Sequence, residues 1–247
     1  MVLAIVQARM QSTRLPGKAM KTINGKPLLG CLLERLSLSK LIDKIIIAAP
    51  SSNNNDVLCA YAEELGYEVY RGSEADVLER YFEAATKFQG NTIVRLTADC
   101  PLIDPALVDE VIRNFEAHPE YDLVATGLSY PDGLDTEVFS FETLKAAHEQ
   151  ASLPSEREHV TSFIKNSEHF KTMALTLEKD YSFLRLTVDE PVDLELVTEV
   201  FAALSSERGA AFSLRDILAL YESKPHIFDK NRHIVRNQGY WESVKND

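Results

Sequence analysis

A cluster of positive charge occupies the start of a chain that is otherwise acidic. The formal net charge of the 247 residues is −12, and an even spread of the 38 acidic residues would place about five of them in the first 33 positions. The first acidic residue is Glu34, whereas the segment before it contains Arg9, Arg14, Lys18, Lys21 and Lys26. Guanidinium groups bind phosphate oxygens in pairs, and an ammonium group binds them as a point charge. We therefore interpret residues 9–26, the basic loop, as a site for a phosphate-rich anion, with a solvated surface loop as the alternative.

The basic loop follows an apolar run, Val2 to Val6, that predicts a buried strand. Ligands of parallel α/β sheets bind beyond the carboxyl ends of the strands, which is where this loop is expected. The loop contains neither GxxxxGK[ST] nor GxGxxG, so two common phosphate-binding loops are excluded. Its three cations and two hydroxyl groups between positions 9 and 18 can instead surround a triphosphate.

Carboxylates follow two of the expected strands. A strand over 92–97 ends just before Asp99, and a strand over 183–188 ends just before Asp189. Mg²⁺ binds oxygen ligands, commonly one or two carboxylates together with substrate phosphates. We expect Asp99 and Asp189 to meet across one Mg²⁺, although Asp189 could equally cap the helix that follows. Asp193 is interpreted as structural.

Two polar segments, 131–137 and 155–159, lie where loops are expected. Either could line the pocket of an acceptor molecule. The alternatives are a turn with solvated carboxylates for the first and, for the second, a helix start with Ser155 as cap and Glu158 as its capping-box partner. The candidate acceptor-binding side chains are Asp132, Asp135, Glu137, Arg157 and His159. No histidine has zinc-ligand spacing, and no GxSxG motif suggests acyl transfer.

Strand-like and helical patterns alternate through the first half of the chain. Short runs rich in Val, Ile and Leu predict buried strands, and amphipathic segments between them predict helices that glycines such as Gly66 and Gly90 end. This alternation is typical of a doubly wound α/β fold, with a mostly parallel central sheet and helices on both faces. The expected strands are 2–6, 45–49, 68–70, 92–97 and 122–126, and the expected helices are 27–39, 54–65, 76–88 and 105–118. Asn54 or Asn55 is expected to cap the second of these helices.

After Gly127 the pattern is less regular. We expect a strand over 138–141, helices over 142–150 and 157–166, two strands over 170–177 and 183–188 in antiparallel arrangement, and helices over 191–204 and 213–221. A single domain is expected over 1–223, with a nucleotide half at about 1–126 and an acceptor and metal half at about 127–223. The polar tail, 224–247, is assigned no structure.

Composition and charge exclude several classes of function. The acidic balance argues against a nucleic-acid binder, because phosphate-backbone affinity depends on Lys and Arg. No apolar stretch has membrane-spanning length and no signal peptide is recognised, so a cytoplasmic enzyme without a membrane partner is expected. The three cysteines lack CxxC pairing and are interpreted as small buried hydrophobes. The oligomeric state is left open, with a homodimer as one expectation.

The motifs together carry a resemblance to a known family. The segment from Ala8-Arg9 through Ser12 to Lys18 resembles the signature loop of the CMP-sugar-acid synthetases, which include the 3-deoxy-manno-octulosonate and acylneuraminate cytidylyltransferases. Five further motifs, in order, are similar to the spore coat polysaccharide biosynthesis protein F family: DVLERY at 76–81, TADCPL at 97–102, DGLDTEVF at 132–139, REHV at 157–160 and TVDEP at 187–191. The match spans about residues 1–205.

This resemblance implies a GT-A-like, Rossmann-type nucleotidyltransferase fold and a Mg²⁺-dependent cytidylyltransferase. Such an enzyme transfers CMP from CTP to a sugar acid or sugar-like acceptor, with release of pyrophosphate, in surface polysaccharide or glycan precursor biosynthesis. It implies triphosphate contact and catalysis by Arg9 and Lys18, assistance by Arg14, and metal binding by Asp99 and Asp189. Further implied nucleotide contacts are Gln7, Ala8, Ser12, Arg71, Asp76, Thr97 and Ala98.

One departure from the sugar-acid synthetases concerns the metal segment, where Ala98-Asp99 stands in place of their usual Gly-Asp pair. The resemblance still implies a metal-binding role for Asp99, but it does not imply which acceptor the enzyme uses. Two rival functions follow from the same fold: a glycosyltransferase that uses a nucleotide-sugar donor, and a nucleotide-binding module without catalytic activity. The abundance of cations for a triphosphate favours the nucleotidyltransferase.

Overall fold

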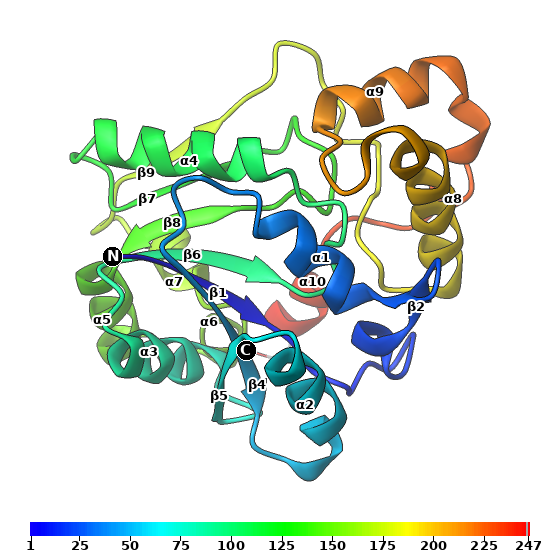
Figure 1. Cartoon of the computed structure of the whole chain (residues 1–247). Helices are drawn as coiled ribbons and strands as arrows, with labels where there is room; N and C mark the ends of the chain where they lie inside the picture. Colours follow the sequence, from blue (N-terminus) through cyan, green and yellow to red (C-terminus); the bar gives the residue numbers. More distant parts are fainter. Residues whose placement is uncertain (246) are drawn as a thin grey trace.

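The computed structural model describes residues 1–245 and 247, apart from the side chains of residues 207 and 208. Its centre is a seven-stranded sheet in the order β5-β4-β1-β6-β8-β7-β9 (Figure 1). The strands are β1 (Val2–Gln7), β4 (Lys44–Pro50), β5 (Glu68–Gly72), β6 (Thr92–Thr97), β7 (Leu123–Thr126), β8 (Glu137–Ser140) and β9 (Thr172–Leu175). A short hairpin of β2 (Thr22–Ile23) and β3 (Lys26–Pro27) closes the basic loop.

Of these seven strands, only β8 runs against the others. It pairs antiparallel with β6 and β7, whereas β1 pairs parallel with β4 and β6, β4 with β5, and β7 with β9. Leu3 to Val6 in the central strand are fully buried, as a strand covered on both faces requires. The predicted mostly parallel sheet is confirmed.

Helices cover both faces of the sheet and enclose two hydrophobic cores. The first core packs α1 (Leu28–Leu36), α2 (Asp56–Glu64), α4 (Pro105–Ala117), α8 (Pro191–Arg208) and α9 (Leu214–Ser223). The second packs α3 (Val77–Phe88), α5 (Phe141–Gln150) and α7 (Ser162–Asn166) on the opposite face. Figure 1 shows α3 and α5 on one side of the central strands and α8 and α9 grouped at the other end of the molecule.

Local signals explain where several helices begin and end. Asp76 caps α3, since its Oδ1 accepts a hydrogen bond from the backbone N–H of Glu79 at 2.8 Å. After α2, Gly66 has a φ of +86°, so it takes the left-handed conformation that ends a helix. The predicted stop at Gly90 is shifted by one residue, because Gln89 adopts the left-handed conformation instead.

Three predictions for the second half were wrong in detail: the extent of one helix, the pairing of two strands, and the existence of one of those strands. The helix expected over 157–166 is broken into α6 (Pro154–Glu158) and α7, with Val160 at a φ of +56° between them. The expected strands over 170–177 and 183–188 are not an antiparallel pair, because β9 runs parallel to β7.

Residues 183–188 do not form a strand, although their apolar alternation is real. Leu184, Leu186 and Val188 are fully buried. Their backbone groups bond to loops on either side rather than to a strand: the Leu186 N–H donates to the carbonyl of Asp132, and the Val188 N–H to that of Asp99. The segment therefore ties the 131–133 turn to the loop that carries Asp99.

The tail that the sequence left unassigned is folded against the domain. It contains η3 (Pro225–Ile227) and α10 (Gln238–Val244), and the buried Asn231 anchors it by donating to the Arg185 carbonyl at 3.0 Å and to Asp193 at 2.8 Å. Among the described helices, none has the length and apolar composition needed to cross a membrane.

Candidate active site

Three side chains that are far apart in the sequence meet at the carboxyl edge of the parallel strands. The ammonium nitrogen of Lys18 lies 2.7 Å from Oδ2 of Asp99 and 2.7 Å from Oδ1 of Asp189. Lys18 opens the short helix η1 (Lys18–Met20) after β1, Asp99 follows the neighbouring β6, and Asp189 precedes α8. The structure thus brings together the cation and the two carboxylates that the sequence singled out.

The charges of this group stabilise one another. Burial lowers the pKa of Lys18, but the two adjacent carboxylates outweigh burial and raise it overall. Burial likewise raises the pKa of Asp99, but the charge and hydrogen bond of Lys18 dominate and hold it at about 2. Lysine and aspartate therefore remain ionised near neutral pH, as phosphate and metal binding require.

Two carboxylates around one cationic centre form a donor set that fits a divalent metal ion. Mg²⁺ keeps several waters and is commonly held by one or two carboxylates together with substrate phosphates. Within the described part of the chain, no group of three or more His, Cys, Asp or Glu side chains is arranged to hold a metal. The set therefore fits a hard cation shared with a phosphate ligand better than a metal enclosed by protein.

Arg185 holds the acidic side of this site in place. Its guanidinium, with the side chain 6% exposed, bonds to Asp189 at 2.9 Å, to Asp193 at 3.0 Å and to Asp132 at 2.8 Å. Asp193 is fully buried and accepts hydrogen bonds at 2.9 Å from the backbone N–H groups of both Asp189 and Glu190. The helix-cap alternative for Asp189 is wrong, since Glu190 occupies the cap position. The structural role of Asp193 is confirmed.

The basic loop is held by a residue from the neighbouring strand–helix connection. The backbone N–H of Met10 donates to Oδ1 of Asn55 at 2.9 Å, and the Met10 carbonyl accepts from the N–H of Gly17 at 2.9 Å. Gly17 has a φ of +69°, which favours glycine at the turn that delivers Lys18. Asn55 was expected as a candidate cap of α2, but its side chain makes no cap bond and supports the loop instead.

The two arginines of the loop are placed differently. Arg14 lies 3.2 Å from Asp189 and 3.8 Å from Glu190, so it belongs to the Lys18 group. Arg9 is exposed and, among the described residues, makes no ion pair or side-chain hydrogen bond. Burial lowers the pKa of Arg80 and of His159, and the charge of Arg9 adds a smaller lowering to both. Among the described residues, Arg9 is therefore not one of the partners in the ion pairs around Lys18.

A second charged group lies on the sheet next to β1. Glu137 is buried and its carboxylate bonds to Arg95 at 2.7 Å, to Thr161 at 3.0 Å and to Lys165. Arg95 also donates to the side-chain oxygen of Gln7 at 3.4 Å. Because protein groups take up both oxygens of Glu137, direct contact with an acceptor has no support here. The carboxylate orients Arg95 instead.

Glu137 should contribute to stability in a pH-dependent way. Burial raises its pKa, but Lys165 and Arg95 outweigh burial and lower it from the ordinary 4.5 to about 2. The contribution is therefore present above pH 4.5 and is lost as the pH falls toward 2. We expect Glu137→Gln to lower the free energy of unfolding by on the order of 3 kcal/mol at pH 7 and by clearly less at pH 3. Urea unfolding at both pH values measures this, and an equal loss at both would contradict it.

The remaining predicted nucleotide positions lie along the same edge. The backbone N–H of Ala98 donates to the Gln7 carbonyl at 3.0 Å, which extends the β1–β6 pairing up to Asp99. Arg71 pairs with Asp56 at 2.6 Å at the outer strand β5. The other predicted members of this set lie nearby: Ala8 directly follows β1, Ser12 lies in the basic loop, Thr97 ends β6 and Asp76 caps α3.

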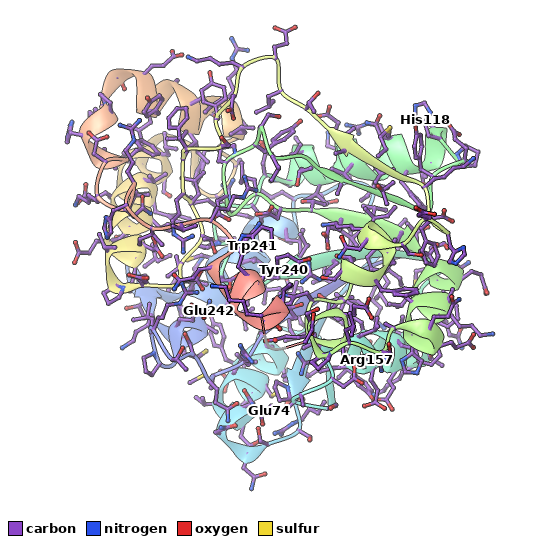
Figure 2. All side chains as sticks on the ribbon, turned by 180° about the vertical axis from the view of Figure 1, so that it is seen from behind. Glu74, His118, Arg157, Tyr240, Trp241 and Glu242 are labelled. Atoms are coloured by element: carbon purple, nitrogen blue, oxygen red, sulfur yellow. The ribbon has the colours of Figure 1, made fainter. Side chains whose placement is uncertain are left out.

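The structure divides the predicted acceptor residues into two groups. Asp132 and Asp135 lie with Arg236 of the tail, whose guanidinium bonds to Asp135 at 2.9 Å. Arg157 pairs with Asp76 at 2.5 Å, and His159 stands edge-on to Tyr240 of α10 with ring centres 5.1 Å apart. Helix α10 thus reaches the second group, as the labelled Arg157 and Tyr240 show in Figure 2.

Sequence reasoning missed three elements of this site. Arg185 was not singled out, although Arg185 and Asp189 stand four residues apart on either side of a strand-like run. Asn55 was read as a helix cap, and the tail was given no role. Asn55 and the tail have no motif of their own, because each acts through residues that are distant in the sequence.

Comparison with known proteins places this geometry in a family. Residues 3–234 match the sequence model of a family described as cytidylyltransferase. An uncharacterised protein of Methanocaldococcus jannaschii is 33% identical over 98% of each chain. The spore coat polysaccharide biosynthesis protein SpsF of Bacillus subtilis is 33% identical over 81% of this chain and 86% of its own. An 8-amino-3,8-dideoxy-manno-octulosonate cytidylyltransferase of Shewanella amazonensis is 26% identical over 81% and 85%.

Solved structures agree with this assignment of the fold. A cytidylyltransferase from Leptospira borgpetersenii superposes with a TM-score of 0.88 at 32% identity, covering 95% of this chain and 99% of its own. A CMP:2-keto-3-deoxy-manno-octonic acid synthetase in complex with CTP gives 0.64 at 16% identity over 82% and 98%. A Mycobacterium tuberculosis protein in complex with manganese gives 0.55 at 18% identity over 80% and 98%. The latter two share the fold.

Proposed function

The chain belongs to the cytidylyltransferase family, and from this premise we propose that it transfers CMP from CTP to a sugar acid or sugar-like acceptor. Pyrophosphate is the other product. The reaction would serve the biosynthesis of a surface polysaccharide or glycan precursor, as the names of the SpsF and octulosonate relatives suggest. A cytoplasmic location and a homodimer remain predictions.

The observation that carries the proposal is the position of Lys18 between Asp99 and Asp189, with 2.7 Å to each carboxylate. A cation and a pair of carboxylates at the carboxyl edge of a parallel sheet can bind a triphosphate and a metal side by side. Arg14 adjoins this group, and Arg9 is exposed beyond it. The cations of the basic loop suit a triphosphate better than the diphosphate of a nucleotide-sugar donor, so the glycosyltransferase is less favoured.

We assign the metal as Mg²⁺, held by Asp99 and Asp189. The donor set suits a hard oxygen-binding cation, and a structural neighbour was solved with manganese, which supports use of a divalent ion. When bound, the ion supplies neutralisation of phosphate charge. Lys18 would then supply its ammonium group to the triphosphate.

In the proposed reaction, an acceptor oxygen attacks the α-phosphorus of CTP. A new O–P bond forms, the bond between the α-phosphorus and the bridging oxygen of the β-phosphate breaks, and pyrophosphate leaves with that electron pair. An attacking hydroxyl gives up its proton to solvent. Lys18 and Arg9 stabilise the negative charge on the phosphates, so the protein acts by position and electric field and forms no covalent intermediate.

The direct test compares the four nucleoside triphosphates with the full-length chain in the presence of Mg²⁺. We expect CTP to raise the melting temperature more than ATP, GTP or UTP, because a ligand that binds only the folded state stabilises it. Pyrophosphate release should then require both CTP and a sugar acid such as 3-deoxy-manno-octulosonate or its 8-amino-3,8-dideoxy analogue. Stabilisation by UDP-sugars or GDP-sugars, without stabilisation by CTP, would instead support the glycosyltransferase.

A further inference from the structure

A cavity of about 450 Å³ lies where the tail meets the start of α8. Its lining includes Glu190, His233, Gln238, Trp241 and Lys245. The volume falls within the range of about 300–1,000 Å³ that small-molecule sites occupy. Most of the lining comes from residues after 234, the last position matched by the family model, so the cavity is a feature that the shared family core does not define.

The cavity adjoins the phosphate and metal residues. Glu190, which forms one wall, directly follows Asp189 in the chain, and its Oε1 lies 3.8 Å from a guanidinium nitrogen of Arg14. A molecule in this cavity would therefore lie beside the carboxylate and the basic loop. This is where an acceptor must be held if its oxygen is to reach a nucleotide phosphate.

The opposite wall presents a tryptophan. Trp241 is the single tryptophan of the chain, and it is 55% exposed despite its large apolar ring. Its ring packs at 65° against Tyr240 with centres 5.2 Å apart, and Tyr240 in turn packs edge-on to His159. Figure 2 shows Tyr240 and Trp241 side by side on α10, near the middle of the view. The indole is thus supported from behind while part of its surface stays accessible.

The tail that carries Trp241 is fixed to the domain at several points. Arg236 donates to the Tyr130 carbonyl at 2.9 Å, Ser243 bonds to Glu158 at 2.8 Å, and Asp247 accepts from the Ser155 hydroxyl at 2.6 Å. The first contact precedes α10, the second lies within it and the third follows it, and their partners belong to the loop around Tyr130 and to α6. The indole is therefore held at a defined position next to the site.

We propose that this cavity binds the sugar ring of the acceptor, with the indole of Trp241 as its stacking platform. The inference rests on the proposed function and identifies where that function places its second substrate. One face of a pyranose ring is lined by C–H groups and packs on an indole, while the amide of Gln238 and the carboxylate of Glu190 can hydrogen-bond to hydroxyls. Lys245 and His233 supply donors for the carboxylate of a sugar acid.

The single tryptophan makes acceptor binding directly observable. The full-length chain is saturated with Mg²⁺ and a CTP analogue whose α,β-bridge is a methylene group, then titrated with 3-deoxy-manno-octulosonate and its 8-amino-3,8-dideoxy analogue. We expect a saturable change in indole emission with at least one of the two sugar acids. Calorimetry with the same ligands gives an independent dissociation constant that should agree.

Variants separate the stacking role from general effects. In pyrophosphate-release assays, Trp241→Ala should raise the acceptor KM by about tenfold and leave the CTP KM within about twofold, while Trp241→Phe should restore most of the acceptor affinity. Leu65→Ala is a matched control, because Leu65 is also a large apolar side chain, 46% exposed, but lies at the far end of α2. It should change neither constant.

The proposal would be overturned if both sugar acids bound by calorimetry without altering indole emission, or if neither bound at all. An unchanged acceptor KM in Trp241→Ala would overturn it as well. Failure of the proposed function has a different signature: the CTP analogue would give no thermal stabilisation of the native chain before any sugar is added.

Discussion

Replacing Asp99 by asparagine should lower the rate of pyrophosphate release by about 10²–10³ while leaving the fold intact. The substitution keeps the shape of the side chain but removes a charge that Lys18 contacts at 2.7 Å. It also removes one of only two carboxylates proposed to hold the metal, so both phosphate charge neutralisation and the position of Lys18 are lost together.

Lys18→Ala should have an effect of similar size, and the double variant should be little worse than either single one. Residues that act as one unit lose their shared contribution when either is removed. Steady-state assays with CTP and a sugar acid measure this, and a thermal melt confirms folding. Glu116→Gln, an exposed carboxylate on α4, is the control and should retain the native rate. Full activity in either single variant would show that the group is not catalytic.

The largest effect on stability is expected at Arg185. Its guanidinium is the common partner of Asp132, Asp189 and Asp193, and the last of these is fully buried. Arg185→Met preserves much of the side-chain volume but leaves the fully buried Asp193 without the cation that it contacts at 3.0 Å. Breaking a buried ion pair in this way typically costs about 3–5 kcal/mol, and we expect a loss of that size in the free energy of unfolding.

Urea unfolding at neutral pH measures this loss through the midpoint, provided that the slope is unchanged. Arg185→Lys should recover only part of it, because an ammonium cannot reproduce three directional contacts. Arg232→Met offers a comparison within the tail, since the Arg232 side chain is 49% exposed and its ion pair with Asp229, at 3.0 Å, is exposed as well. If Arg185→Met destabilised the protein no more than Arg232→Met, the buried network would not be the support that we infer.

The parallel core and the centre of the site could be predicted from the sequence. Val2 to Val6 is a continuous apolar run, and Thr92 to Thr97 is rich in β-branched and apolar residues. Such segments have few alternatives to a strand in a covered sheet. Once these two runs pair side by side, the residues that follow them must meet at one edge. This is why the basic loop and Asp99 were expected at the same edge of the sheet, whereas the specific role of Lys18 came from the resemblance to the sugar-acid synthetases.

The second half could be predicted less well, because its order depends on contacts between distant segments. Residues 183–188 alternate as a strand does, but their partners are two loops, which no periodicity reveals. The tail is polar and short in apolar residues, and its place depends on Asn231 reaching the Arg185 carbonyl and Asp193. These contacts join segments that are far apart in the sequence, so no local motif predicts them.

The support of Met10 by Asn55 bears on any attempt to move the basic loop into another protein. Residues 9–18 carry the charged groups of the loop. The side-chain oxygen of Asn55, which accepts the hydrogen bond that fixes the loop backbone, belongs to a separate segment 45 residues after Met10. A transplanted loop that lacked a matching asparagine beside it would keep its charges but lose the backbone anchor. For protein engineering, the smallest segment that should be transferred is therefore β1 and β4 together with the loop that follows each strand. A recombination crossover between Gly17 and Asn55 would separate the loop from the residue that holds its backbone.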